Sequence, residues 1–309
     1  MRISTFNAYE NVIFNLQTRQ RGLQHSQEQL TSGKRVAKPS DDPVAAARAE
    51  RSLATIARAE AHQRALEAAR TATQLTESAL GDAGELVQQV RETLVAAGNP
   101  TYSDNERAML VQKLSGLRQQ LLSVANRGDG TGSYLFGGQG SSSPPFVDGA
   151  TGVTYDGSAG DTLVASDEAL ALSIDGSETW LQAPAAVTGD PPLSLFDVVD
   201  TAITELGATG VPASQISAAV TVGIRDLDAV NNHVLAARAR AGEALARMET
   251  VELRNADARL AAQTERSAAE DLDMVDAISD FQNRQTGYDA ALRAYSLVQR
   301  MSLFNYIGG

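Results

Sequence analysis

The two ends of this 309-residue chain carry the same pattern, and that pattern constrains the fold most. Over residues 5–32, and again over roughly the last 35 residues, apolar residues recur at alternating three- and four-residue steps. Two apolar positions in every seven residues form the narrow stripe of a coiled coil, whereas a helix on a globular core has a wider stripe. We therefore expect the two ends to form helices that pair with each other.

The residues of these stripes are the predicted assembly interface. At the N-terminal end they are Phe6, Tyr9, Ile13, Leu16, Leu23 and Leu30. At the C-terminal end they are Ile278, Phe281, Tyr288, Leu292, Tyr295, Val298, Leu303 and Phe304. Glutamines interrupt both stripes, at Gln20, Gln27 and Gln285. So narrow a seam buries too little apolar area to offset the entropy of ordering about 70 residues, and we expect the ends to become ordered on assembly.

A helix stop and a helix restart follow the first stripe. Gly33 is placed to end the first helix, and Lys34 and Arg35 favour the negative end of the helix dipole. Asp42 is a strong N-cap residue, and Pro43 suits the first turn of the next helix. Two adjacent carboxylates could also serve catalysis, but the Pro and Ala residues that follow match capping position by position.

Long helices are predicted on both sides of the middle of the chain, where Ala, Glu, Gln and Arg dominate. The expected helices cover residues 43–97, 104–126, 193–206 and 213 to about 305. The last of them is too long for one compact domain. We therefore expect a joint at Gly242 or in the polar stretch of residues 264–270.

The middle of the chain has a different composition, rich in Gly, Ser and Thr. Short alternating segments with Asp-Gly turns predict antiparallel strands at residues 133–136, 152–155 and 170–174. Trp180 and Leu181 are expected to close this part.

The predicted fold class is mainly α, a long-helix bundle with an antiparallel terminal coiled coil and a small β-sheet or sandwich domain inserted in the middle. The predicted domains are a terminal coiled-coil domain (1–42 and 266–309), a helical bundle domain (43–131 and 193–265) and an inserted acidic β domain (132–192).

Composition excludes several classes of function. The net charge is −12, and residues 131–224 hold 11 acidic residues and no Lys or Arg, which argues against nucleic-acid binding there. The chain has no cysteine, so thiol catalysis, disulfides and cysteine zinc sites are excluded. Membrane insertion and a Sec signal peptide are not expected, because no long apolar run and no cleavage site are present.

Residues that could carry chemistry have simpler interpretations. The histidines His25, His62 and His233 are too far apart for a metal motif. The glycine loop at 127–132 lacks the Gly-Lys-Ser/Thr end of a phosphate-binding loop. The last candidates favour a solvated helix face over a cation site: Asp271, Asp273, Asp276 and Asp280. We expect no cofactor, no metal and no enzyme activity.

Two motifs carry a family resemblance. Residues 30–36 (LTSGKRV) and 39–47 (PSDDPVAAA) resemble the signature after the first helix of flagellin-like proteins. The Asp-Asp-Pro-Val sequence of residues 41–44 is more similar to flagellar hook-associated protein 3, the hook–filament junction family, than to flagellins. Residues 134–138 (YLFGG), Pro144-Pro145-Phe146 and the stretch from Asp271 to Tyr306 are similar to the same family.

The resemblance implies a secreted subunit of the bacterial flagellum, located at the hook–filament junction and exported by the flagellar type III apparatus. Its implied partners are other copies of itself in a ring of about eleven subunits, hook-associated protein 1, flagellin and an export chaperone. The terminal helices would pair on incorporation and pack against those of neighbours.

Three alternatives stay open at this point. Flagellin shares both ends of the pattern and would polymerise into long filaments. An enzyme or carbohydrate-binding module would place its site in residues 132–192. An ordinary cytosolic coiled-coil adaptor would not leave the cell.

Overall fold

The structure is a computed structural model that describes residues 2–139, 142–150, 152–158, 160, 162–164, 170–187 and 189–307. The side chains of residues 2–9, 162–173 and 298–307 lie outside this description. The chain forms two compact units, residues 1–60 with 256–309 and residues 61–255. The predicted three-domain division is a different partition and stays a prediction.

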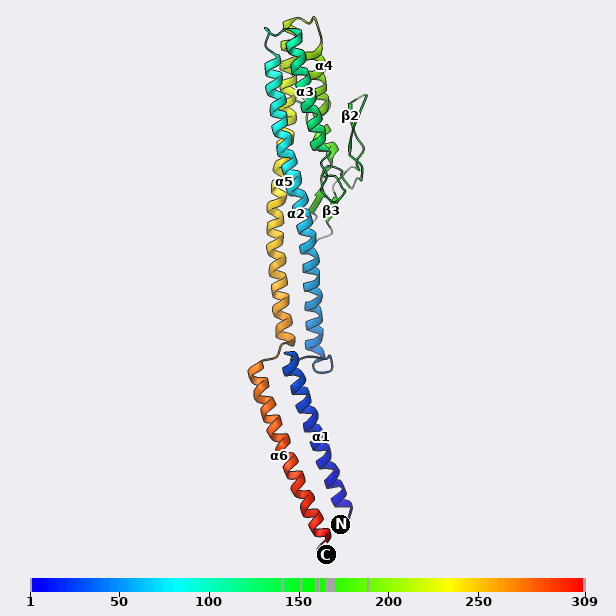
Figure 1. The fold of residues 1–309 in the computed structure, drawn as a ribbon, viewed down its shortest axis with the longest axis vertical. Helices are drawn as coiled ribbons and strands as arrows, with labels where there is room; N and C mark the ends of the chain where they lie inside the picture. The colour runs from blue at the N-terminus through cyan, green and yellow to red at the C-terminus, as the bar shows by residue number, and fades with distance from the viewer. Residues whose placement is uncertain are drawn as a thin grey trace. The chain divides into compact units, whose positions relative to one another are not determined.

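Helices make up most of the chain, which confirms the predicted mainly α fold class (Figure 1). The α-helices are α1 (Arg2–Ser32), α2 (Pro43–Ala97), α3 (Asp104–Ala125), α4 (Leu195–Gly207), α5 (Ala213–Glu270) and α6 (Met274–Ile307). The ends of α2 and α3 agree with the predicted ends within one residue, because caps mark them. Ser103 and Glu106, for example, form a reciprocal capping box at the start of α3.

The joint in the last long helix lies later than predicted. Residues 264–270 are helical, Gly242 lies inside α5, and the chain leaves the helix only between Glu270 and Met274. Asp273 caps α6 by accepting bonds from the backbone N–H groups of Val275 and Asp276. The predicted solvated helix face was therefore wrong for Asp271 and Asp273, which lie at the joint.

The core of the larger unit lies where α2, α3, α4 and α5 meet. Leu80 and Leu94 of α2, Leu114 and Leu121 of α3, and Leu227 of α5 are at most 1% exposed. Helix α4 has apolar residues on a well-defined stripe and buries Leu195, Phe196 and Leu206 in the same cluster. This unit therefore has a conventional close-packed interior.

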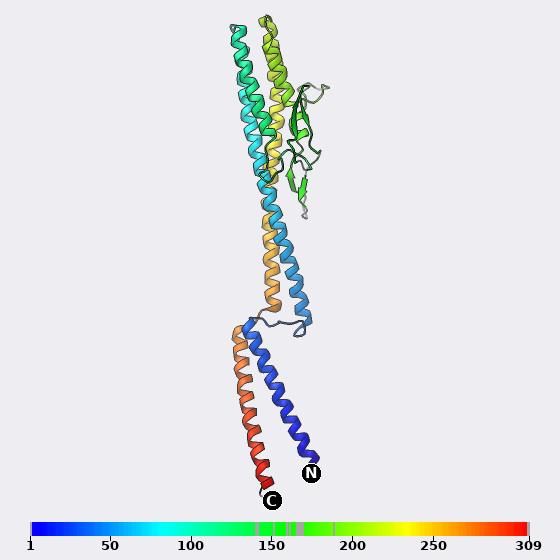
Figure 2. The ribbon, with the colours of Figure 1, turned by 45° about the vertical axis from the view of Figure 1, so that its right-hand side comes forward.

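The β structure of this unit lies beside the helices in both side views (Figures 1 and 2). Strands β1 (Phe146–Gly149) and β2 (Gly152–Tyr155) pair antiparallel, as do β3 (Thr162–Val164) and β4 (Leu170–Ser173), in two separate sheets. A π-helix, η1 (Ser177–Leu181), follows.

The predicted strands at 152–155 and 170–174 are confirmed, whereas the strand at 133–136 was wrong. Tyr134 forms an isolated antiparallel bridge to Gly128, made by bonds from Leu135 N–H to the Arg127 carbonyl and from Asp129 N–H to the Ser133 carbonyl. The predicted small antiparallel β structure is present, as two described sheets of two strands each. Sequence reasoning missed β1 and β3.

An aromatic cluster joins the β structure to the helices. Trp180 of η1, Phe136 and Phe196 of α4 are fully buried, and Trp180 stacks on Phe196 with ring centroids 6.2 Å apart. Phe146 of β1 and Tyr155 of β2 pack against each other at 5.3 Å, and Phe146 also contacts Trp180 and Phe196. The chain's only tryptophan thus reports on the interior of this unit.

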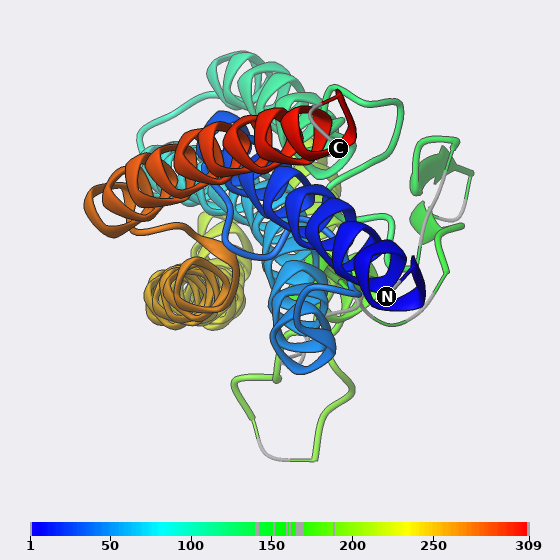
Figure 3. The ribbon, with the colours of Figure 1, turned by 90° about the horizontal axis from the view of Figure 1, so that it is seen from below.

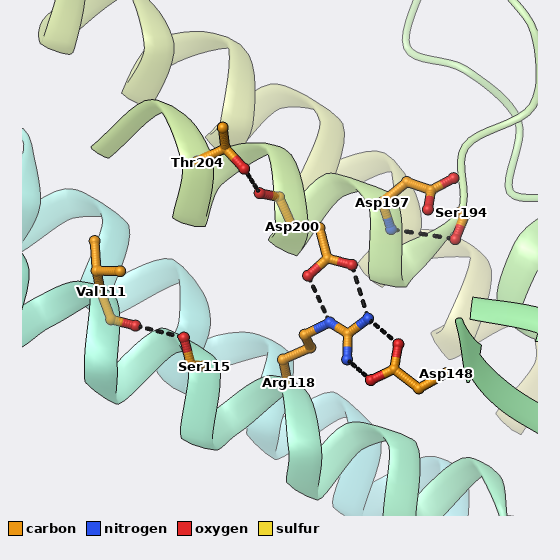
Figure 4. Close-up of polar contacts among 8 residues, drawn as sticks. All are labelled: Val111, Ser115, Arg118, Asp148, Ser194, Asp197, Asp200 and Thr204. Atoms are coloured by element: carbon orange, nitrogen blue, oxygen red, sulfur yellow. Dashed lines mark hydrogen bonds and ion pairs between the residues drawn. The ribbon is translucent and has the colours of Figure 1, made fainter. Parts of the chain in front are cut away.

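An arginine from α3 ties the acidic middle segment to the helices (Figure 4). The Arg118 guanidinium donates to both carboxylate oxygens of Asp148 on β1, each at 2.7 Å, and to Asp200 on α4 at 2.9 Å. Glu178 of η1 pairs with Arg240 of α5. Arginines from other segments of the chain therefore pair with several carboxylates of the acidic middle segment.

Candidate assembly interface

The two terminal helices lie side by side and antiparallel within the smaller unit (Figures 1 and 3). Their register is fixed from the joint outward. Leu272 N–H donates to the Gly33 carbonyl at 3.0 Å. Further along, α1 and α6 contact each other again where Gly22 lies against Arg284. The predicted antiparallel pairing of the two ends is present.

One face of each helix makes this contact, and we call the two together the contact face. Residues on it are partly or fully shielded from solvent: Val12, Leu16, Leu23, Ser26 and Leu30 of α1, and Ala277, Phe281, Tyr288, Ala291 and Tyr295 of α6. Ser26 is the only one of them that is buried, at 4% exposure. Between Glu10 and Leu297, no large apolar side chain of either helix is buried.

The predicted interface residues fall into two sets. Leu16, Leu23 and Leu30 of α1, and Phe281, Tyr288 and Tyr295 of α6, lie on the contact face. The others with described side chains are exposed: Ile13 at 41%, Ile278 at 45% and Leu292 at 40%. The side chains of Phe6, Tyr9, Val298, Leu303 and Phe304 lie outside the described residues.

The stop and restart residues lie at the joint between α1 and α2. Helix α1 ends at Ser32, and Gly33 follows with φ of 70°, a left-handed conformation that costs other residues about 1 kcal/mol or more. The Asp42 carboxylate accepts from the N–H groups of Ala45 at 3.0 Å and Val44 at 3.1 Å, and α2 begins at Pro43. The Ala45 bond leads the causes that lower the pKa of Asp42.

The adjacent carboxylate has a separate structural role. Asp41 accepts from the backbone N–H groups of Lys38 at 2.9 Å and Ala37 at 3.1 Å, which closes a turn before α2. These bonds lower the pKa of Asp41, the Lys38 bond most of all. Both carboxylates are thus engaged by backbone donors, as the capping interpretation expects.

The linker after α1 is tied to the C-terminal end of α5, which sequence reasoning missed. Arg35 N–H donates to the Glu270 carbonyl at 2.7 Å, and the Arg35 guanidinium donates to the Ala269 carbonyl at 2.8 Å. Lys34 pairs with the Glu270 carboxylate at 3.3 Å. We call these four residues the linker clasp. The only sequence signal was the basic pair after Gly33, which we had attributed to the helix dipole.

Other features of the smaller unit offer no convergent chemistry. A groove of about 550 Å³ between α2 and α5 is lined by Leu53, Ile56 and several charged residues, among which Arg266 pairs with Glu270. Within the described part of the chain, no cluster of three or more His, Cys, Asp or Glu could hold a metal ion. No described helix is long and apolar enough to cross a membrane.

Comparison with known proteins first defines a class. Residues 3–141 match the family model described as bacterial flagellin N-terminal helical region. The flagellar junction protein of Legionella pneumophila has a similar fold, with a TM-score of 0.60 at 19% identity over 72% of this chain and 100% of that one. The terminal helix and its stop signal are thus of the flagellin type.

Two full-length relatives define the family more closely. Flagellar hook-associated protein 3 of Salmonella typhimurium is 34% identical over 98% of this chain and 99% of its own length. Its namesake in Escherichia coli is 31% identical, also over 98% of this chain and 99% of its own length. The chain belongs to the flagellar hook-associated protein 3 family.

Proposed function

We propose that this chain is a structural subunit of the bacterial flagellum that joins the hook to the flagellin filament. Full-length similarity to flagellar hook-associated protein 3 supports the hook association. The similar fold of a protein described as a flagellar junction protein supports the place in the flagellum. The chain would leave the cell through the flagellar type III apparatus, accompanied until then by an export chaperone.

The proposed assembly mechanism rests on the exposure of apolar side chains in the terminal helix pair. Ile13, Ile278 and Leu292 are each at least 40% exposed. The contact between α1 and α6 buries no large apolar side chain among residues 10–32 and 274–297. Because exposed apolar area is costly in water, the pair is stable only when more of it is covered. Neighbouring subunits in a ring of about eleven would supply that cover and order the two ends.

A junction subunit must contact different partners above and below. Interfaces that join different patches of identical subunits build tubes, whereas two-fold interfaces close into dimers. Such a ring can present one surface to hook-associated protein 1 and another to the first flagellin subunits. The larger unit, with its own core, would keep its fold throughout.

Immunoelectron microscopy tests this function. Gold-labelled antibodies against residues 142–187 should mark one narrow band between hook and filament on isolated flagella. Label along the whole filament would instead identify a flagellin, and label only inside cells would exclude both. Purified flagellin should extend into long filaments, whereas this chain should not.

A further inference from the structure

A single residue, Arg35, contacts three of the four helices whose ends lie at the joint of the smaller unit. Its backbone carbonyl accepts from the side-chain amide of Gln29, in the last turn of α1, at 2.7 Å. Its backbone N–H donates to the Glu270 carbonyl at the end of α5, and its guanidinium donates to the Ala269 carbonyl. The guanidinium also pairs with Asp42, the N-cap of α2, at 3.5 Å. One residue thus links α1 to the ends of two other helices.

These contacts cap the end of α5, because a helix leaves the carbonyl groups of its last turn without partners inside the helix. The Glu270 carbonyl accepts from the backbone N–H groups of Arg35 at 2.7 Å and Val36 at 3.4 Å. The Ala269 carbonyl accepts from the Arg35 guanidinium at 2.8 Å, across a separation of 234 residues in the chain. The positive charge of Arg35 also favours the negative end of the α5 dipole. The cap of α5 is therefore supplied by residues 33–36, which we call the capping segment.

The capping segment is itself held from the side of the terminal helices. Leu272, two residues before α6, donates its backbone N–H to the Gly33 carbonyl at 3.0 Å. The Gln29 side chain reaches the Arg35 carbonyl because α1 is still helical at this residue. The position of the capping segment therefore depends on α1 and α6, whereas its bonding partners at the other side are the carbonyl groups of α5.

Disorder of the terminal helices would therefore reach beyond them. In the free chain, the proposed function leaves α1 and α6 without the cover that orders them. The Gln29 amide and the Leu272 N–H would then no longer lie where they hold the capping segment. The carbonyl groups of Ala269 and Glu270 would face water without their partners from that segment, and the last turn of α5 would fray.

We infer that Arg35 is a conformational relay between the terminal pair and the end of α5. Pairing of α1 with α6 fixes the capping segment, which then caps α5 and holds Asp42 at the start of α2. The joint is loose in the free chain and becomes firm when the subunit is incorporated. The inference rests on the proposed function, because incorporation is the event that orders the terminal pair. Such coupling is reciprocal, so a firm end of α5 in turn favours the paired state of the terminal helices.

Hydrogen exchange of the full-length chain tests the relay, measured free in solution and within flagella purified from cells that produce each variant. Arg35→Ala removes the guanidinium bonds to α5 and α2. Gln29→Ala removes the bond from α1 to the Arg35 carbonyl and leaves every bond to α5 in place. One control is Lys38→Ala, in the same linker, whose ion pair with Glu28 is exposed. The other is Gln24→Ala on α1, an exposed side chain without a hydrogen bond to any described residue.

We expect the amides of residues 266–272 to exchange at least about tenfold more slowly in flagella than in the free chain. Arg35→Ala and Gln29→Ala should each remove most of this difference, while the amides of residues 79–97 stay equally protected throughout. The two control variants should change the exchange of residues 266–272 by less than about twofold. Gln29→Ala is the most informative variant, because its effect on the end of α5 must pass through Arg35.

A static cap without a relay gives a different result, in which Arg35→Ala accelerates the exchange of residues 266–272 equally in the free chain and in flagella. That result, or an unchanged end of α5 in Gln29→Ala flagella, would overturn the inference. If Arg35→Ala does not enter flagella, Arg35→Lys replaces it, which keeps the charge without the forked guanidinium and should show a smaller loss. Absence of the unsubstituted chain from flagella would contradict the proposed function and with it the trigger of the relay, whereas the two results above contradict the relay alone.

Discussion

The larger unit and the terminal helix pair use similar helices in opposite ways. In the larger unit, Phe136, Trp180 and Phe196 are fully buried, and leucines from four helices fill the space around them. In the terminal pair, the only buried side chain from residue 10 to residue 32 or from 274 to 297 is that of Ser26. The difference teaches that helix content alone does not indicate a folded domain. The larger unit has a buried apolar core of its own, whereas the apolar side chains of the terminal pair are only partly covered.

The largest expected difference comes from the same substitution in the two regions. Phe196→Ala removes a fully buried ring from the aromatic cluster and should lower the free energy of unfolding of the larger unit by about 3–5 kcal/mol. Phe14 lies on α1 in the smaller unit and is 62% exposed. Phe14→Ala should therefore change the free energy of unfolding of the larger unit by less than about 0.5 kcal/mol. Urea unfolding followed by Trp180 fluorescence measures both, and equal effects would remove the contrast between the regions.

The second effect concerns the arginine that ties β1 and α4 to α3. Arg118 is 12% exposed in its side chain and bonds to Asp148 and Asp200, so Arg118→Ala should destabilise the larger unit by about 2 kcal/mol. Arg240→Ala breaks an ion pair whose side chains are both 57% exposed and should cost about 0.5 kcal/mol or less. A larger loss for Arg240→Ala would mean that the acidic segment is held mainly at α5.

Two glycine substitutions compare the joint after α1 with the interior of helix α2 in the larger unit. Gly33→Ala must adopt φ of 70° and should weaken the joint by about 1 kcal/mol, seen as faster hydrogen exchange of the Leu272 amide. Gly84→Ala lies inside α2 with open space around it, and should stabilise the larger unit by up to about 1 kcal/mol. Destabilisation by Gly84→Ala would show a packing constraint there that the structure lacks.

The smallest effect is one of pH. The Arg118 guanidinium lowers the pKa of Asp148 below its ordinary 3.8, so the folded larger unit binds fewer protons than the unfolded chain. The stability this provides is present above pH 3.8 and is lost as the pH falls through the lower, folded pKa. Thermal unfolding followed by Trp180 fluorescence should show a shallower acid dependence for Asp148→Asn. An unchanged acid dependence would assign the effect to other carboxylates.

Sequence reasoning succeeded where a local signal decides the structure. Caps and glycines set the ends of α2 and α3, and the residues from Leu30 to Ala47 indicated the family. It also predicted that the two ends pair. The helix ends and the family motif depend on neighbours within a few residues, and the pairing of the two ends was inferred from the local repeat that each end carries, so a single sequence displays these signals directly.

It failed where contacts span long stretches of the chain. A seven-residue repeat does not say which of two adjacent rows faces the partner, so Ile13 and Leu16 were given the same role although one is exposed. The bonds of Arg118 to Asp148 and Asp200, and of Arg35 to Glu270, join segments that no local pattern connects. The joint at residues 271–273 was misplaced because Asp271 and Asp273 suit a helix face as well as a cap.

Hydrogen exchange of the free chain and of the chain within purified flagella tests most directly whether the terminal pair is completed by its neighbours. We predict that backbone amides of residues 10–30 and 277–295 exchange quickly in the free chain and become strongly protected in flagella. Amides of residues 79–97 and 195–206 should be protected equally in both. Terminal amides that are already protected in the free chain, with no further protection on assembly, would contradict the proposal that the terminal pair becomes ordered only when other subunits cover it.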